Sequence, residues 1–183
     1  MRSSQRIPAA IGLLLLLLLA SYGCSVQPPV EEPKLAQQAM DQAKSVQADK
    51  LDSLDWGNAM AKFKDADLMV KKNRFSDAKA FYLQSKSRFD TAYKVAKERR
   101  DSLAREVDDA RSMISSDYAK VKAQLAKAKG KRRKDAEASC AEIDKSMADF
   151  DKVVKEGDVI KAKLMTKDIL EKIYQASRAM GGS

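Results

Sequence analysis

Residues 75–128 constrain the fold more than any other stretch, because they contain no proline or glycine and repeat small or apolar side chains mostly at intervals of three and four. This spacing predicts one amphipathic helix, with an apolar face opposite charged faces. The helix would be about 80 Å long, which exceeds the usual extent of a compact domain of this size. It therefore needs partner helices along its apolar face. The repeating positions are Phe75, Ala78, Tyr82, Ser85, Phe89, Ala92, Ala96, Leu103, Val107, Ala110, Ile114, Tyr118, Val121, Leu125 and Ala128.

The segments around the long helix also favour helices, because the chain has no proline after Pro33. We expect helices over residues 35–50, 55–72, 132–156 and 159–180, with a break at 51–57 where Asp55 caps the next helix. Asn73 and Gly157 suit the left-handed conformation that ends a helix, and Gly130 permits a chain reversal. The sequence thus predicts an all-α protein of long antiparallel helical hairpins, packed as a coiled coil or a helical bundle, over residues 35–180.

Two of the expected turns resemble copies of one unit. When Asn73 is laid on Gly157, an offset of 84 residues, apolar positions on both sides of the two turns coincide. This match predicts two related hairpins, over residues 55–128 and 132–180. Any two amphipathic hairpins match in part, so chance similarity is the alternative.

The N-terminus carries the pattern of an export signal. Arg2 and Arg6 precede an apolar run over residues 11–20 that includes seven consecutive leucines, Leu13 to Leu19. This run is shorter than the roughly 20 residues that cross a bilayer, so a signal peptide over residues 1–23 is predicted instead of a membrane span.

Gly23-Cys24, at the end of this run, resembles the lipobox of bacterial lipoproteins. The resemblance implies cleavage before Cys24 and a lipid anchor on its thiol, in the cell envelope, and Ser25 resembles the outer-membrane sorting pattern. Residues 24–34 would then be a lipidated, proline-rich tether. The alternative is a plain secretory signal cut nearby, because Ser21 and Tyr22 stand where that family prefers Leu and a small residue.

A second likeness covers roughly one repeat and consists of Ala66, Asn73, Phe75, Ala78, Tyr82 and Ser85. This series resembles the second half of a tetratricopeptide repeat, in which a small residue on one helix packs against aromatic and alanine residues on the next. Behind a lipobox, the long alanine-rich helices resemble bacterial envelope lipoproteins with a helical domain of unknown function. That resemblance implies a fold and a location, and no activity.

The residues present argue against catalysis and metal binding. The chain contains no histidine, the commonest general base and a common zinc ligand. Lipidation of Cys24 would leave Cys140 as the single thiol, on an apolar stripe where a small buried side chain is expected. Adjacent acids such as Asp108 and Asp109 point in different directions on a helix. We therefore expect no enzyme, no cofactor and no metal.

Three residues in the middle of the long helix are candidates for partner binding: Tyr93, Arg99 and Arg100. They occur where the apolar stripe skips from Ala96 to Leu103. Tyr and Arg are enriched among residues that carry binding energy at protein interfaces. A solvated kink or an ordinary charged face would explain the same residues.

The segment 127–134, called the basic tip below, is the second candidate site. Six of its eight residues are basic: Lys127, Lys129, Lys131, Arg132, Arg133 and Lys134. Such a cluster at the tip of a hairpin can contact anionic lipid or polysaccharide. The alternative is a solvated turn whose charges cap two helix ends.

Together these features predict a non-catalytic, lipid-anchored envelope lipoprotein that acts as a helical scaffold or adaptor for another envelope protein. The alternative is a module that contacts a membrane or glycan through the basic tip. The expected location is the outer membrane, facing the periplasm. Expected partners are the membrane, through Cys24, and another envelope protein, with an oligomer possible. Nucleic acid is not expected as a partner of an exported chain.

Overall fold

The computed structural model describes residues 26–181, and within this range the chain forms helices and no strand. The all-α prediction is confirmed. The predicted signal peptide and Cys24 lie outside the described residues. The helices are α2 (Glu31–Ser45), α3 (Ala48–Leu51), α4 (Ser53–Lys71), α5 (Phe75–Lys127), α6 (Gly130–Glu156) and α7 (Val159–Ala179).

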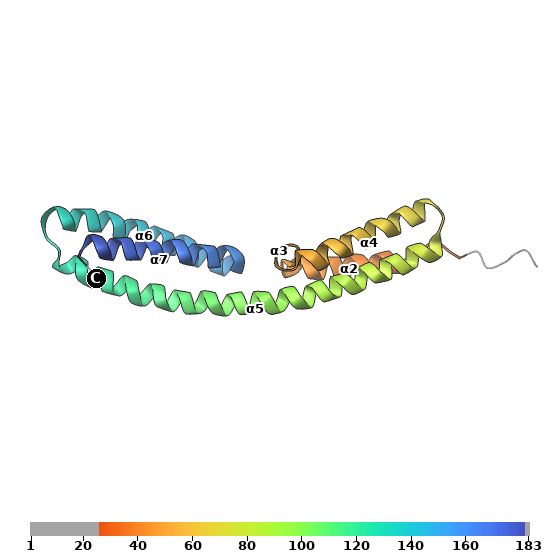
Figure 1. Ribbon diagram of the computed structural model, residues 1–183, viewed down its shortest axis with the longest axis horizontal. Coiled ribbons are helices and arrows are strands. Elements are labelled where there is room, and N and C mark those ends of the chain that lie inside the picture. The colour runs from red at the N-terminus through yellow and green to blue at the C-terminus, as the bar shows by residue number, and fades with distance from the viewer. Residues whose placement is uncertain (1–25, 182–183) are drawn as a thin grey trace, which may run out of the picture.

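Helix α5 is the longest helix and extends through the whole molecule. It runs without interruption for 53 residues, which confirms the long helix predicted over residues 75–128. Figure 1 shows α5 as a shallow bow along the whole rod, with the other helices on its concave side. Long helices curve in this way, convex toward solvent, when they wrap around a core.

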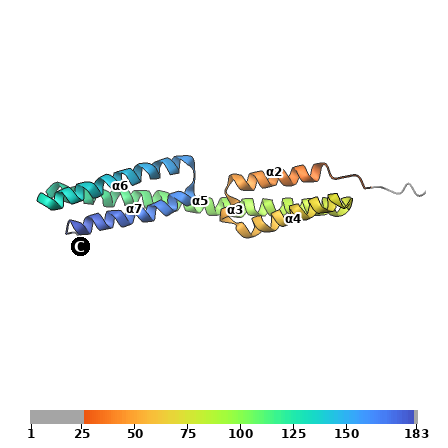
Figure 2. The ribbon, with the colours of Figure 1, turned by 90° about the horizontal axis from the view of Figure 1, so that it is seen from above.

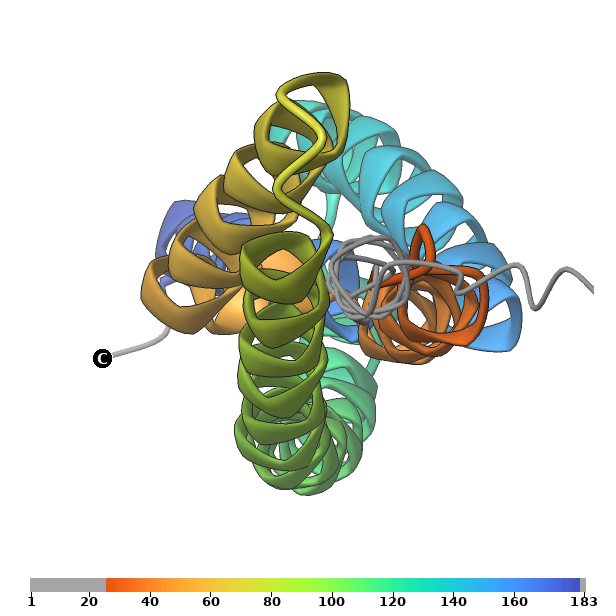
Figure 3. The same ribbon diagram turned by 90° about the vertical axis from the view of Figure 1, so that its right-hand side faces the viewer.

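The partner helices form two separate groups along α5. Helices α2 and α4 lie on either side of its first half, and α6 and α7 on either side of its second half (Figure 2). Figure 3 views the rod from the end at which the α4–α5 turn lies. We call the group with α2, α3 and α4 the proximal bundle and the group with α6 and α7 the distal bundle. The predicted hairpin 55–128 therefore spans both bundles.

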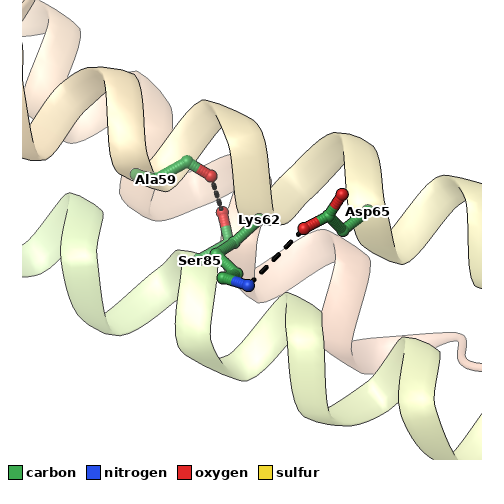
Figure 4. A network of polar contacts seen from close by, with 4 residues as sticks. All are labelled: Ala59, Lys62, Asp65 and Ser85. Atoms are coloured by element: carbon green, nitrogen blue, oxygen red, sulfur yellow. Dashed lines mark hydrogen bonds and ion pairs between the residues drawn. The ribbon is translucent and has the colours of Figure 1, made fainter.

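The proximal core consists mainly of alanine, which allows close approach of the helices. Phe89 is its largest fully buried side chain, and the ring of Trp56 meets it edge-on with centroids 5.1 Å apart. Ser85 is also fully buried, and its Oγ donates a hydrogen bond to the carbonyl of Ala59 at 2.9 Å (Figure 4). The small Ser85 side chain thus joins α4 to α5 without leaving a buried hydroxyl unpaired.

The distal core uses larger aliphatic side chains. Its buried members include Val107, Ile114, Val121, Ile143, Phe150, Ile169 and Ile173. Tyr118 donates a hydrogen bond to the backbone carbonyl of Cys140 at 2.9 Å, which joins α5 to α6. Cys140 is buried in this core, as its place on the apolar stripe predicted.

The two predicted turns have the same geometry. Asn73 and Gly157 are left-handed, with φ of 57° and 76°. The amide of Arg74 donates to the carbonyl of Met69, and at the offset of 84 residues the amide of Asp158 donates to the carbonyl of Val153. This is the hydrogen bond of a Schellman motif.

The same offset superimposes buried positions of α5 on buried positions of α7. The pairs are Ala78 and Ala162, Tyr82 and Thr166, Ser85 and Ile169, Phe89 and Ile173, and Ala92 and Ala176. A common origin of the two hairpins stays a prediction.

The predicted break at residues 51–57 is confirmed in part, because the chain leaves the helix at Asp52, between α3 and α4. The predicted cap at Asp55 is wrong, and an earlier break at residues 46–47 was not predicted. Helix α2 ends at Ser45, because Gln47 is left-handed with φ of 61° and reverses the chain. Val46 and Ala48, on either side of it, are both buried in the proximal core. Helix α4 then begins at Ser53, so Asp55 lies in its first turn and Gly57 inside the helix. Burial of Val46 and Ala48 in the proximal core explains the break at Gln47.

Two helices begin earlier than predicted: α2 begins at Glu31, so residues 31–34 of the predicted tether are helical, and α6 begins at Gly130 instead of residue 132.

Candidate functional site

The middle of α5 joins the two bundles. Residues 97–106 include no buried side chain, although buried residues repeat along α5 on both sides. The proximal bundle ends here at the α3–α4 link, and the distal bundle ends here at the α6–α7 turn (Figure 1). We call this region the joint.

Arg99 ties α5 to the α3–α4 link. Its guanidinium donates a hydrogen bond to the carbonyl of Leu51 and lies 3.6 Å from the Asp52 carboxylate. Asp52 is buried, and its Oδ2 accepts no hydrogen bond within residues 26–181. Burial raises the pKa of Asp52, the neighbouring Asp55 raises it further, and the charge of Arg99 opposes both effects.

Arg100 and Gln47 connect the proximal side of the joint to the α6–α7 turn. The Arg100 guanidinium lies so close to Gly157 that a Cβ there would be 3.4 Å from Nη2. The Gln47 side-chain amide donates to Asp158 Oδ1 at 3.4 Å. Asp158 also accepts from the backbone amide of Lys161, and this bond, aided by Gln47, lowers the pKa of Asp158.

The structure thus gives all three residues proposed for partner binding a contact within the chain. Tyr93 packs against the proximal core, Arg99 contacts Leu51 and Asp52, and Arg100 lies against Gly157. The skip in the apolar stripe marks the boundary between two bundles. Partner binding by these residues stays a prediction.

Replacing Asp52 with Asn should change the pH dependence of stability. A carboxyl whose pKa is higher in the folded state binds its proton more tightly there, so its contribution to stability falls as pH rises through the interval between the two pKa values. We therefore expect the stability of Asp52→Asn, relative to the parent, to increase with pH over the acidic range. Urea denaturation at several pH values measures this. A difference that decreases with pH would contradict the raised pKa.

The basic tip lies at the end of the rod opposite the α4–α5 turn (Figure 1), and Val26 lies beside that turn. Its turn, at Ala128 and Lys129, is extended and joins α5 to α6. Arg133 forms an ion pair with Glu137 at 2.9 Å. The other five basic side chains of the tip make no ion pair with any residue from 26 to 181.

An open cleft of about 610 Å³ lies between this tip and the end of α7. Gln124, Lys127, Ala128, Lys129, Lys131, Arg132, Met180 and Gly181 line it. The cleft therefore gathers four of the six cations of the tip.

A second open cleft, of about 730 Å³, lies between α5 and α7 on the distal bundle. Met113 and Leu164, which line it, are 57% and 71% exposed. An ion pair between Glu106 and Lys163, at 2.9 Å, lies at its edge. Sequence reasoning missed this cleft because Met113 and Leu164 lie beside the predicted apolar stripes. The signal available in the sequence was that these apolar side chains lie outside the predicted buried face of each helix.

Two tyrosines have raised pKa values that packing explains. Burial raises the pKa of Tyr82, whose hydroxyl donates to Asp67, and burial likewise raises the pKa of Tyr118. Residues 26–181 contain no cluster of three or more potential ligands for a metal ion. Over the same residues, no helix combines the length and apolar character that a membrane span requires.

The chain matches no family model, no curated protein and no solved structure.

Proposed function

We propose that this protein is a non-catalytic, lipid-anchored rod of the cell envelope that acts as a scaffold for another envelope protein. The separation of the two ends of the rod carries this proposal. Val26 lies in a small cleft beside residues 73–77, at the α4–α5 turn. The basic tip lies at the far end of α5, about 80 Å away for a helix of this length. An anchor at Cys24 would therefore fix one end of the rod and extend the other.

Helix faces are the expected binding surface for the partner protein. The cleft between α5 and α7 exposes Met113 and Leu164 with charged residues at its edge, a composition typical of an interface centre and rim. Tyr93 and Arg100 at the joint are partly exposed beside their contacts within the chain. The cleft between α5 and α7 and the joint each lie at a fixed position along the rod. A partner bound at either one would therefore be held at a fixed distance from the membrane.

Crosslinking in living cells tests the scaffold. A photo-crosslinking residue is placed singly at Met113, Leu164, Tyr93 and Arg100, and at Leu83 on the proximal bundle as an exposed control. We expect adducts with one defined envelope protein from the distal cleft or the joint, and none with that protein from Leu83. If no helix-face position gives an adduct, the scaffold proposal is wrong.

Contact of the basic tip with an anionic layer is a second candidate function. Five cations without an ion-pair partner in residues 26–181, at the end away from the α4–α5 turn, favour it. This function and the scaffold are compatible, since they use different surfaces.

The anchor at Cys24 gives a direct prediction. Durable membrane binding needs more than one acyl chain, and a lipoprotein anchor supplies several, so the parent should resist alkaline extraction. We expect Cys24→Ser to move from the membrane to the soluble fraction, or to stay uncleaved. Fractionation and the mass of the mature chain distinguish these results. A processed Cys24→Ser protein that is extracted no more easily than the parent would contradict lipidation at this residue.

A further inference from the structure

Nearly all the net charge of the body lies in the basic tip. Without Arg2 and Arg6, outside the described residues, the net charge of +9 becomes +7. The six basic and no acidic residues of 127–134 supply six of these seven charges. The rest of the rod is close to neutral, so its field is concentrated at one end.

The fold arranges these cations around a concave surface. Lys127 ends α5, Lys129 lies in the α5–α6 turn, and Lys131 and Arg132 lie in the first turn of α6, yet all four line the same cleft of about 610 Å³. Met180 and Gly181 close its other side. An anionic group in this cleft would meet four positive side chains at once, and charge-assisted hydrogen bonds to phosphate or carboxylate are among the stronger ones.

The same charges are unfavourable for the helix that carries them. The first turn of α6 has no acidic residue, and its N-cap, Lys129, makes no side-chain hydrogen bond to the helix. Cations near the positive end of a helix dipole destabilise the helix. By contrast, α7 begins with Asp158, whose carboxylate accepts from the amide of Lys161. A bound anion would offset these cations and interact favourably with the N-terminal end of α6.

The surroundings of the cleft favour a polymer strand over a bilayer. Amphipathic helices that bind at a bilayer surface insert Trp, Phe or Leu beside their basic residues, whereas a basic cluster without them attracts anionic lipid by charge alone. Residues 127–134 contain no aromatic or large aliphatic side chain, and Met180 is only partly exposed. A concave, basic tip without an aromatic or large aliphatic side chain in residues 127–134 fits a chain that carries anionic groups along its length.

We propose that this cleft binds an anionic polysaccharide through its phosphate or carboxylate groups, with Lys127, Lys129, Lys131 and Arg132 as the contacts. This inference depends on the second function proposed above, contact of the tip with an anionic layer, and specifies its ligand. Together with an anchor at Cys24, the cleft would connect a membrane to a polysaccharide layer one rod length away.

Binding to defined polymers tests the proposal. The protein is residues 25–183, which contains every helix and core residue described and lacks the proposed anchor. Polygalacturonate is the carboxylate probe, neutral dextran the control polymer, and vesicles of phosphatidylglycerol the membrane probe. We expect salt-sensitive binding to polygalacturonate, no binding to dextran, and weaker binding to the vesicles.

Two triple variants with the same charge change locate the site. Lys129→Glu, Lys131→Glu and Arg132→Glu reverse three charges in the cleft, and we expect the affinity for polygalacturonate to fall at least tenfold. Lys64→Glu and Lys71→Glu on α4 and Lys72→Glu at its C-cap reverse three exposed charges on the proximal bundle, and should change this affinity less than twofold. Circular dichroism confirms that both variants keep their helices. Equal losses in both would show binding by net charge alone and overturn the proposal.

A single substitution separates binding from folding. Lys129→Asp supplies the side-chain cap that α6 lacks, so we expect a higher melting temperature together with weaker polymer binding. Unchanged polymer binding in this variant would exclude the cleft. Binding to vesicles without binding to polygalacturonate would overturn the proposal that the ligand is a polysaccharide. It would still support contact of the tip with an anionic layer. Binding to neither probe would overturn both.

Discussion

Phe89→Ala should lower the free energy of unfolding by about 3–5 kcal/mol. Phe89 is fully buried in the proximal core and meets the ring of Trp56 at 5.1 Å. Most other buried residues of this core are alanines, including Ala59, Ala92 and Ala96, which have no larger side chain to move into the space left by the ring. The cavity should therefore stay largely unfilled. Urea denaturation followed by circular dichroism measures the change.

Leu83→Ala on the same helix is the matched control for Phe89→Ala. Leu83 is 49% exposed, so we expect a change within about 0.5 kcal/mol. Trp56 is the single tryptophan of the chain, so its fluorescence reports directly on the packing around Phe89. If Phe89→Ala denatures at the same urea concentration as the parent, with unchanged Trp56 emission, α4 does not pack on α5 as described.

Ser102→Pro should break the rod in the middle while leaving both bundles folded. Proline removes a helical hydrogen bond and clashes with the carbonyl four residues earlier, which costs about 3 kcal/mol or more inside a helix. Ser102 is exposed at the joint, so the substitution removes no core contact. Within residues 26–181, α5 alone runs through both bundles. We expect nearly unchanged helical content in circular dichroism and a smaller maximum dimension in small-angle X-ray scattering.

Ser102→Ala controls for the loss of the hydroxyl at this position. Alanine favours a helix, so this variant should keep the dimension of the parent and equal or exceed its stability. A Ser102→Pro variant with the same maximum dimension and melting temperature as Ser102→Ala would mean that α5 does not carry the shape of the rod.

The long helix and its turns could be predicted because their signals are local. The spacing over residues 75–128 defines an apolar face without knowledge of its partners, and α5 follows it from Phe75 to Lys127. Asn73 and Gly157 mark turns because few residues tolerate a left-handed conformation, and both adopt it. The charge of the basic tip is likewise visible in eight consecutive residues.

Features that depend on distant contacts could not be predicted in the same way. Gln47 is left-handed although glutamine gives no sign of it, because Val46 and Ala48 are buried on either side. The sequence showed only that Arg99 and Arg100 interrupt the apolar stripe of α5 between Ala96 and Leu103. Their contacts with Leu51 and Gly157 join residues far apart in sequence.

The same reason applies to the candidate sites. Met180 lies beside the basic tip only because α7 runs parallel to α5, from the joint back to the tip, so the cleft is invisible in the segment 127–134. The placement of this tip opposite the α4–α5 turn also depends on the two bundles extending in opposite directions from the joint. Sequence reasoning therefore found the charged residues and missed the surface that they line.

The distance between the two ends of the rod tests the central claim most directly. Dyes are attached at Lys72→Cys and Lys131→Cys in a Cys140→Ala background of residues 25–183, which removes the one other thiol. Both sites are exposed, one at each end of α5. Single-molecule energy transfer should report one population near 80 Å, the length of a continuous 53-residue helix. A dominant population at about half that distance would mean that the bundles fold back on each other, and it would contradict a rod that separates the proposed membrane anchor from the basic tip.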